Sequence, residues 1–149
     1  MPTGCNADFL KDRTKRFALQ VIYMCRTLPR SQEGGIIVRQ LLRSSTSVGA
    51  NYRSVCRARS TADFVSKLGV VLEEADETLF WIELLVESGL VRSEKIAVLK
   101  REASELVAIF VASLRTAKGF KSEIYNLKSL TCFAILTIGS RSPLLSATS

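Results

Sequence analysis

Four arginines in the first half of the chain are spaced so that they could contact phosphate groups together. Arg39, Arg43, Arg53 and Arg57 follow one another at intervals that return to the same side of a helix, which turns by about 100° per residue. Guanidinium groups pair well with phosphate oxygens, and Arg59 follows closely in the sequence. The row predicts a phosphate-contacting surface. The alternatives are a solvated outer face and salt bridges to neighbouring acids.

A run of carboxylates, Glu73, Glu74, Asp76 and Glu77, is the second group that could do chemistry. Paired carboxylates can hold metals inside helical bundles, but such sites usually combine several acidic clusters with histidines. This chain has no histidine and no second carboxylate cluster of that density. Glu73 and Glu77 are one helical turn apart, so we expect them to pair with arginines of a neighbouring helix or subunit.

Nucleophilic and metal chemistry find little support elsewhere in the sequence. The lack of histidine excludes histidine-based acid–base catalysis, Ser/His triads and histidine metal sites. The four cysteines have no CxxC spacing, and Cys25 and Cys56 lie on or beside apolar faces, which favours reduced, buried thiols. We therefore expect no catalytic residues, no metal, no cofactor and no enzymatic activity.

Charge is distributed unevenly along the chain. The formal net charge is +7, but the first 59 residues alone contain 11 Lys and Arg against 3 Asp and Glu. Such a distribution can attract RNA or DNA, or it can pair helices within a bundle or across subunits. The N-terminus does not have the pattern of a signal peptide, and no apolar run reaches the roughly 20 residues of a membrane helix. These features predict a cytoplasmic protein.

Apolar periodicity predicts the helices that position these side chains. Residues recur at steps of three and four in four segments: Asp12–Leu28, Ile36–Arg57, Ser60–Ser88 and Ser93–Lys118. Pro29 ends the first segment, Ser60 and Ser93 are suited to cap the third and fourth, and Gly89 is placed to end the third. We read Arg30–Gly35 as a polar loop. Short connections place consecutive helices antiparallel, so the prediction is an all-α, up-down-up-down four-helix bundle.

The second predicted helix has an unusually small middle, from Ser44 to Ala50. Gly49 costs about 1 kcal/mol relative to alanine in a helix interior. Close approach of a neighbouring helix would offset this cost, and a local kink is the alternative.

The third predicted helix is apolar well beyond one face. Phe80, Trp81, Leu84 and Leu85 widen its core stripe, and a helix of this kind needs cover on more than one side. We expect these four residues to form an oligomer interface. For Trp81, core packing is the more conservative reading.

The last 30 residues break the helical pattern. We assign residues 1–119 to the bundle domain and residues 120–149 to a poorly ordered C-terminal tail. The short apolar run Leu130–Ile138, with Cys132, has neither a clear helical period nor the length of a membrane helix.

The segment Gln40–Leu90 also carries a family resemblance. It reads QLLRSSTSVGANYRSVCRARSTADFVSKLGVVLEEADETLFWIELLVESGL and, with LKDRTKRFALQVI and EASELVAIFVASLRTA on either side, resembles the bacterial four-helix bundle proteins known as 23S rRNA intervening-sequence proteins. The resemblance covers about Phe9 to Lys118 and implies an antiparallel four-helix bundle that assembles into a ring-like homopentamer. A related protein accompanies the reverse transcriptase of diversity-generating retroelements, where a basic surface binds nucleic acid. The family provides no catalytic residues to carry over.

Together these features predict a non-enzymatic, homo-oligomeric scaffold that binds RNA or DNA through phosphates. No glycine-rich phosphate loop or interleaved aromatics support readout of base sequence, so contacts should be to the backbone. The alternative is an adaptor or assembly factor whose arginine row forms salt bridges between subunits.

Overall fold

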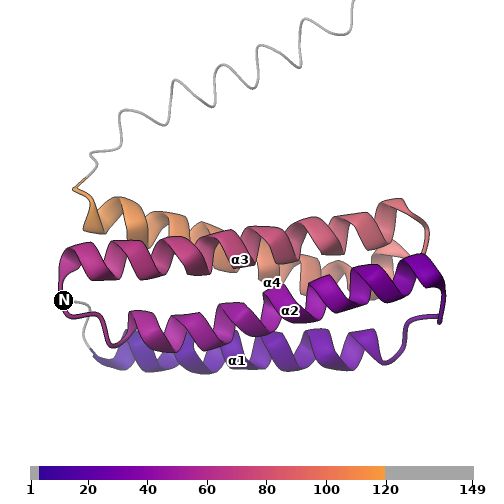
Figure 1. The fold of residues 1–149 in the computed structure, drawn as a ribbon, viewed down its shortest axis with the longest axis horizontal. Helices are drawn as coiled ribbons and strands as arrows, with labels where there is room; N and C mark the ends of the chain where they lie inside the picture. The colour runs from indigo at the N-terminus through magenta and orange to yellow at the C-terminus, as the bar shows by residue number, and fades with distance from the viewer. Residues whose placement is uncertain (1–3, 120–149) are drawn as a thin grey trace, which may run out of the picture. The chain divides into compact units, whose positions relative to one another are not determined.

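The computed structural model describes residues 4–119, and this part of the chain is helical without any strand. The helices are α1 (Gly4–Cys25), α2 (Gln32–Val55), α3 (Thr61–Glu87) and α4 (Ser93–Ala117). Consecutive helices lie side by side and reverse direction at each short turn (Figure 1). The all-helical, four-helix part of the sequence prediction is confirmed.

Helix α1 begins eight residues before the predicted start at Asp12 and ends at Cys25 rather than Leu28. Its buried side includes Leu10, Thr14, Phe17 and Val21, each at most 8% exposed. Thr14 is tolerated there because its hydroxyl donates a hydrogen bond to the carbonyl oxygen of Leu10 at 2.9 Å, one turn back.

Helix α2 begins at Gln32, inside the predicted polar loop Arg30–Gly35. Ser31 is its N-cap, and its Oγ accepts a hydrogen bond from the backbone N–H of Gly34 at 3.0 Å. A Cβ at Gly34 would lie 2.9 Å from that same Oγ, so glycine is needed here for space. The two glycines thus form the first helical turn, and the loop prediction was wrong.

Gly49 lies where the backbone of α1 approaches α2 closely. A Cβ built on Gly49 would stand 3.4 Å from the backbone carbonyl oxygen of Thr14 and 3.8 Å from the backbone nitrogen of Lys15. Close helix approach, the preferred explanation for this glycine, is confirmed.

Gly49→Leu is expected to destabilise the fold by about 1–3 kcal/mol, because atoms beyond Cβ would enter the backbone of α1. Gly49→Ala should be tolerated, since 3.4 Å is an ordinary contact distance. Gly69 offers a matched control, because a Cβ there would meet nothing within 4 Å. Urea unfolding of the three variants measures these differences. Equal stability of Gly49→Leu and Gly69→Leu would contradict the close approach.

The ends of α3 follow the prediction, whereas the start of α4 does not. Ser60 caps α3 by accepting a hydrogen bond from the N–H of Asp63 at 3.1 Å, and Asp63 in turn accepts from the N–H of Arg59 at 2.9 Å. Gly89, with φ of +74°, follows its C-terminus. The N-cap of α4 is Arg92, which makes no side-chain cap hydrogen bond, so the expected Ser93 cap was wrong.

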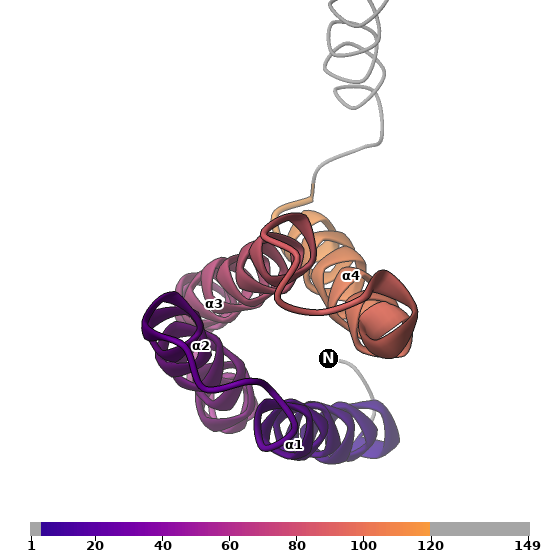
Figure 2. The ribbon, with the colours of Figure 1, turned by 90° about the vertical axis from the view of Figure 1, so that its right-hand side faces the viewer.

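The core lies between the four helices. The largest fully buried side chains include Phe17, Phe110, Leu41, Leu106 and Leu85. Each helix packs chiefly on the next one along the chain, most extensively α2 on α3, whereas α1 and α4 touch much less (Figure 2). A side-chain network closes this α1–α4 seam: the guanidinium of Arg13 lies 2.7 Å from Glu102 Oε1 and 2.5 Å from Glu105 Oε2.

The remaining predictions concern the C-terminal tail, membrane-spanning helices and metal sites. The tail segment Leu130–Ile138 and Cys132 lie outside the described residues. Across residues 4–119, no helix is long and apolar enough to cross a membrane, and no group of three potential metal ligands comes together.

Candidate nucleic-acid interface

The five arginines of the predicted row are all exposed, but they lie on two elements. Arg39, Arg43 and Arg53 belong to α2. Arg57 and Arg59 lie in the turn between α2 and α3, because α2 ends at Val55 rather than at Arg57. We call these five residues the arginine row.

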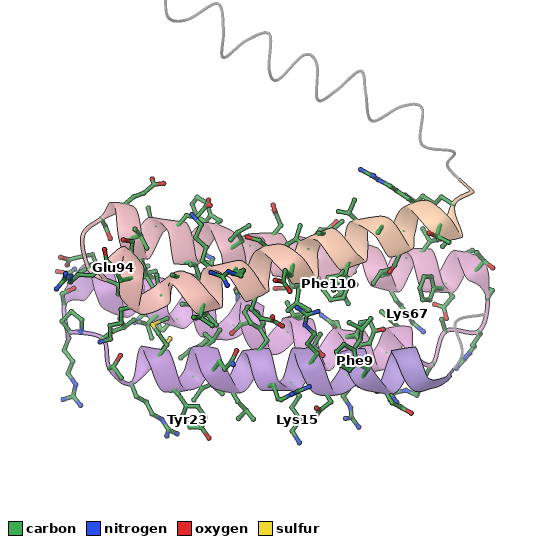
Figure 3. The ribbon with its side chains drawn as sticks, turned by 180° about the vertical axis from the view of Figure 1, so that it is seen from behind. Phe9, Lys15, Tyr23, Lys67, Glu94 and Phe110 are labelled. Atoms are coloured by element: carbon green, nitrogen blue, oxygen red, sulfur yellow. The ribbon has the colours of Figure 1, made fainter. Side chains whose placement is uncertain are left out.

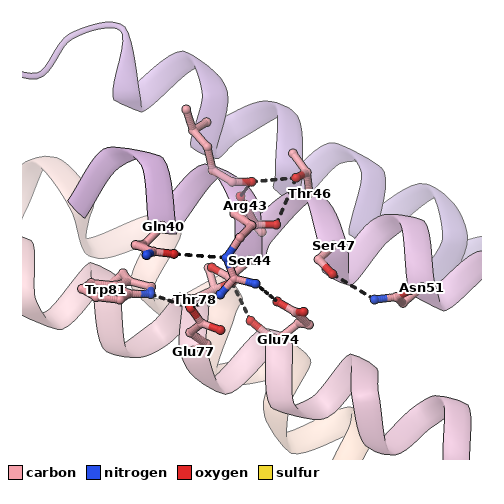
Figure 4. A network of polar contacts seen from close by, with 12 residues as sticks. Gln40, Arg43, Ser44, Thr46, Ser47, Asn51, Glu74, Glu77, Thr78 and Trp81 are labelled. Carbon is pink, nitrogen blue, oxygen red and sulfur yellow. Dashed lines mark hydrogen bonds and ion pairs between the residues drawn. The ribbon is translucent and has the colours of Figure 1, made fainter. Parts of the chain in front are cut away.

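Arg43 differs from the rest of the row because carboxylates of α3 hold it. Its Nη2 pairs with Glu77 Oε1, its Nη1 lies 3.7 Å from Glu74 Oε2, and its Nε donates to Gln40 Oε1 at 3.1 Å (Figure 4). The expectation that Glu73 and Glu77 pair with arginines of a neighbouring helix or subunit is confirmed for Glu77, whereas Glu73 makes no salt bridge within residues 4–119. Arg43 is therefore the member of the row least available to an outside phosphate.

A hydroxyl pair lies beneath this ion pair, between α2 and α3. Thr78 Oγ1 lies 2.9 Å from Ser44 Oγ and 2.7 Å from the carbonyl oxygen of Glu74 (Figure 4). Both side chains are fully buried. Small hydroxyl residues thus let α2 and α3 approach closely while every hydroxyl keeps a partner, and this packing fixes Arg43 opposite Glu77.

Glu77 also accepts a hydrogen bond from Trp81 Nε1 at 3.0 Å. This bond and the one from Arg43 lower the pKa of Glu77 below its ordinary value of 4.5. A carboxyl group with a depressed folded-state pKa contributes stability above its unfolded pKa and loses it as the pH falls through the folded value.

We expect stability at acidic pH to report this arrangement. In the wild-type protein, the ionised carboxylate of Glu77 contributes to the free energy of unfolding, and this contribution should disappear as the pH falls below about 4.5. Glu77→Gln lacks the carboxylate, and therefore the contribution, at every pH. The two stability curves should therefore converge in acid. Urea unfolding monitored by the fluorescence of Trp81, the one tryptophan of the chain, measures both curves. Parallel curves from neutral pH to strong acid would show that Glu77 contributes nothing.

The other four members of the row have no such partners. Within residues 4–119, Arg39, Arg53, Arg57 and Arg59 make no salt bridge. Asp63 lies near Arg59: hydrogen bonds from Lys67 and from the backbone N–H of Arg59 lower the pKa of this carboxyl, and the charge of Arg59 adds to the effect. Exposed guanidinium groups without salt bridges are available to bind anions.

The basic surface continues from α2 onto α1. The contact of Gly49 with the backbone of Thr14 and Lys15 places Lys15 beside α2, and its exposed side chain points away from the bundle (Figure 3). Arg16 follows, paired only with Asp12 at 3.0 Å, and both of these side chains are mostly exposed. Solvent-exposed pairs of this kind contribute little and exchange readily. Lys15 and Arg16 thus add two exposed cations on α1 to those of the arginine row, with the carboxylate of Asp12 paired to Arg16.

Of the four residues expected at an oligomer interface, one is excluded. Leu85 is 1% exposed and belongs to the core of the chain itself, so it cannot also cover a partner. Phe80 is 53% exposed and lies edge-on to Trp81, with ring centroids 4.9 Å apart. Trp81 and Leu84 are half-buried and pack against the core.

Neither of the two cysteine side chains that the structure describes, Cys25 and Cys56, is an activated nucleophile. Cys25 is half-buried, and burial raises the pKa of its thiol to about 11. Cys56 is exposed, contrary to the expectation of burial, and local desolvation still raises its thiol pKa. Both thiols are free and remain protonated at neutral pH.

Sequence patterns missed one feature, an open hollow at the α1–α4 seam. Its six lining residues come from both helices: Phe9, Arg13, Arg16, Phe17, Gln20 and Glu102. Phe9 precedes the start that we predicted for the first helix, so its exposed ring was not assigned to any surface. The i, i+4 and i+7 spacing of Phe9, Arg13 and Arg16 could have indicated one helical face.

Comparison with known proteins places this geometry in context. The family model described as 23S rRNA-intervening sequence protein matches residues 10–112. A crystal structure of a protein with unknown function from the S23 ribosomal protein family of Bacteroides thetaiotaomicron is 32% identical, with a TM-score of 0.65, over 70% of this chain and 97% of that chain. The chain has no match among the curated proteins.

Proposed function

Because the chain belongs to the 23S rRNA-intervening sequence protein family, we propose that it is a non-enzymatic, homo-oligomeric scaffold that binds RNA or DNA through phosphate contacts. The observation that carries the proposal is the set of exposed arginines that make no salt bridge within residues 4–119, Arg39, Arg53, Arg57 and Arg59. A structural role in the chain would have paired their guanidinium groups with carboxylates, as it does for Arg43.

Contact with the phosphate backbone suits this surface better than recognition of bases. Guanidinium groups on one helix and one turn can reach phosphates along a strand, but they do not by themselves form a groove-filling element that reads base edges. We therefore expect binding that is strongly dependent on salt and weakly dependent on sequence.

The homo-oligomer in this proposal is the ring-like pentamer that the family resemblance suggests. A 53% exposed phenylalanine, Phe80, supports an apolar contact on α3, with Trp81 and Leu84 beside it. A ring would repeat the arginine row in every subunit, so that one nucleic acid could bind several rows together.

Titration of labelled RNA and duplex DNA with the purified oligomer over a range of salt concentrations tests the proposal. The logarithm of the association constant should fall linearly with the logarithm of salt concentration, by about 0.9 per phosphate neutralised on duplex DNA. A slope equivalent to several phosphates supports the scaffold. No binding at low salt would overturn it.

The acidity of α3 favours one alternative, an adaptor held together by charge. The helix carries seven carboxylates against one lysine, and the exposed Glu73 and Asp76 make no salt bridge within the described residues. In this case the unpaired arginines of one subunit would meet α3 of the next. High salt, or alanine at the arginines, should then dissociate the oligomer in sedimentation analysis. An oligomer indifferent to both changes would exclude the adaptor.

A further inference from the structure

The hollow at the α1–α4 seam combines aromatic, cationic and polar groups that suit a nucleobase. It has a volume of about 290 Å³ and is open to solvent on one side. Phe9 supplies an exposed aromatic ring at its edge, and the fully buried Phe17 closes it toward the core. Phe9 extends from the side of α1 that faces α4 (Figure 3).

Polar groups around the hollow can form hydrogen bonds with the edge of a base. Glu102 offers carboxylate oxygens, and Gln20 offers an exposed amide with both donors and an acceptor. Arg13 holds Glu102 in place through bonds of 2.7 and 2.9 Å to its two oxygens. Because Arg13 is tied in this way, the polar wall of the hollow is already formed before any ligand binds.

Arg16 connects the hollow to the basic surface. It lines the hollow and follows Lys15, which lies beside α2. Its pair with Asp12 is solvent-exposed, so a phosphate group can replace the carboxylate at small cost. Because Arg16 and Phe9 line the same hollow, a phosphate held by Arg16 brings its neighbouring base within reach of the Phe9 ring.

We infer that the seam hollow is a slot for one unstacked base of a single-stranded nucleic acid, stacked on Phe9. Proteins that bind single strands combine a cationic track for the backbone with aromatic rings on which bases stack. A base paired within a duplex cannot enter the slot. The inference rests on the proposed function, because the arginine row would hold the phosphate backbone of the nucleic acid. It adds that single strands are the preferred class of nucleic acid.

Phe9→Ala tests the slot, and Tyr23→Ala is its matched control. Tyr23 is an equally exposed aromatic on the same helix, 58% against 53%, but it lies outside the hollow and points away from the bundle (Figure 3). The probes are a labelled oligoadenylate, an abasic strand of the same length and a hairpin duplex with the same number of phosphates. Thermal unfolding of each variant checks the fold, and sedimentation checks the oligomer.

Phe9→Ala should weaken oligoadenylate binding roughly 5- to 100-fold, the range for loss of one base–aromatic stack. It should leave the abasic strand and the duplex unaffected, and Tyr23→Ala should change none of the three. Wild-type affinity of Phe9→Ala for oligoadenylate would overturn the slot while leaving the phosphate contacts standing. Equal weakening on all three probes, or a smaller oligomer, would assign Phe9 to assembly instead. If wild-type protein binds none of the probes, the proposed function itself fails.

Discussion

Replacing Arg39, Arg53, Arg57 and Arg59 together with alanine is expected to weaken nucleic-acid binding by on the order of a thousandfold at about 0.1 M salt. Each phosphate contact releases condensed counterions, and at this salt concentration the release is worth nearly a factor of ten per contact. All four side chains are exposed and make no salt bridge within residues 4–119, so their removal should leave the fold intact. The salt slope should decrease by about four.

The control for this variant removes the same charge from elsewhere. Arg30, Arg92, Lys95 and Arg101 are also exposed and lie outside the arginine row, and of these Arg92 pairs with Glu94 at the surface. Their replacement with alanine should cost much less affinity than loss of the row. If both quadruple variants lose affinity equally, net charge rather than the arginine row governs binding.

Replacing Arg43 alone with alanine should weaken binding less than replacing any one of the other four arginines of the row with alanine. The carboxylates of Glu74 and Glu77 already neutralise this arginine, and the structure gives it a role between helices. Fluorescence anisotropy of the five single alanine variants ranks the contributions. If Arg43→Ala caused the largest loss of affinity, Arg43 would have to leave Glu74 and Glu77 and bind the nucleic acid directly.

Phe110→Ala is expected to destabilise the fold by about 3–5 kcal/mol, the usual cost of removing a buried aromatic side chain. Phe110 is 0% exposed and stacks with Tyr52 at a centroid distance of 5.8 Å, which joins α4 to α2 across the core. Unfolding in urea measures the change, at a protein concentration held constant because the proposed assembly would contribute to stability.

Phe80→Ala provides the comparison, since it removes the same atoms from a ring that is 53% exposed. The chain should keep its helix content, and the proposed oligomer should lose mass in sedimentation. If Phe80→Ala were as damaging to helix content as Phe110→Ala, the ring would belong to the fold and not to a subunit contact. If mass and helix content both stayed unchanged, the apolar contact would have to lie elsewhere on the chain.

Periodicity located the helices because most buried positions hold apolar residues at steps of three and four. It failed at the start of α1, where Thr14 occupies a core position and breaks the apolar pattern. The hydrogen bond from its hydroxyl to Leu10 makes the position inexpensive, but a pattern of residue types cannot show that bond. Phe9 lies before the predicted helix start at Asp12, so its place on the surface of α1 was not predicted either.

Glycine and serine residues led to wrong predictions for the starts of α2 and α4. Gly34 and Gly35 suggest a loop in sequence, yet Ser31 caps the helix before them and the tight first turn requires Gly34. Ser93 suggests a cap, but α4 begins at that residue after an extended Arg92. Capping depends on backbone angles that neighbouring helices impose, and composition alone does not fix those angles.

The candidate surface was only partly predictable for the same reason. The spacing predicted Arg39, Arg43, Arg53 and Arg57 on one side of a single helix, whereas α2 ends at Val55 and holds only the first three. Spacing also could not show that Arg43, alone in the row, faces Glu74 and Glu77. The position of Arg43 opposite these carboxylates depends on the axial register between α2 and α3. The buried contact of Ser44 with Thr78 sets this register. The seam hollow likewise depends on how far α4 stands from α1.

The order in which the helices pack has a consequence for how the chain folds. Because each helix packs chiefly on its sequence neighbour, most contacts close short loops, and chains with such low contact order fold in microseconds to milliseconds. The α2–α3 hairpin, with the largest interface, is the natural nucleus. The α1–α4 seam joins distant parts of the chain and should close last, so that Arg13→Ala should accelerate unfolding while leaving the folding rate nearly unchanged.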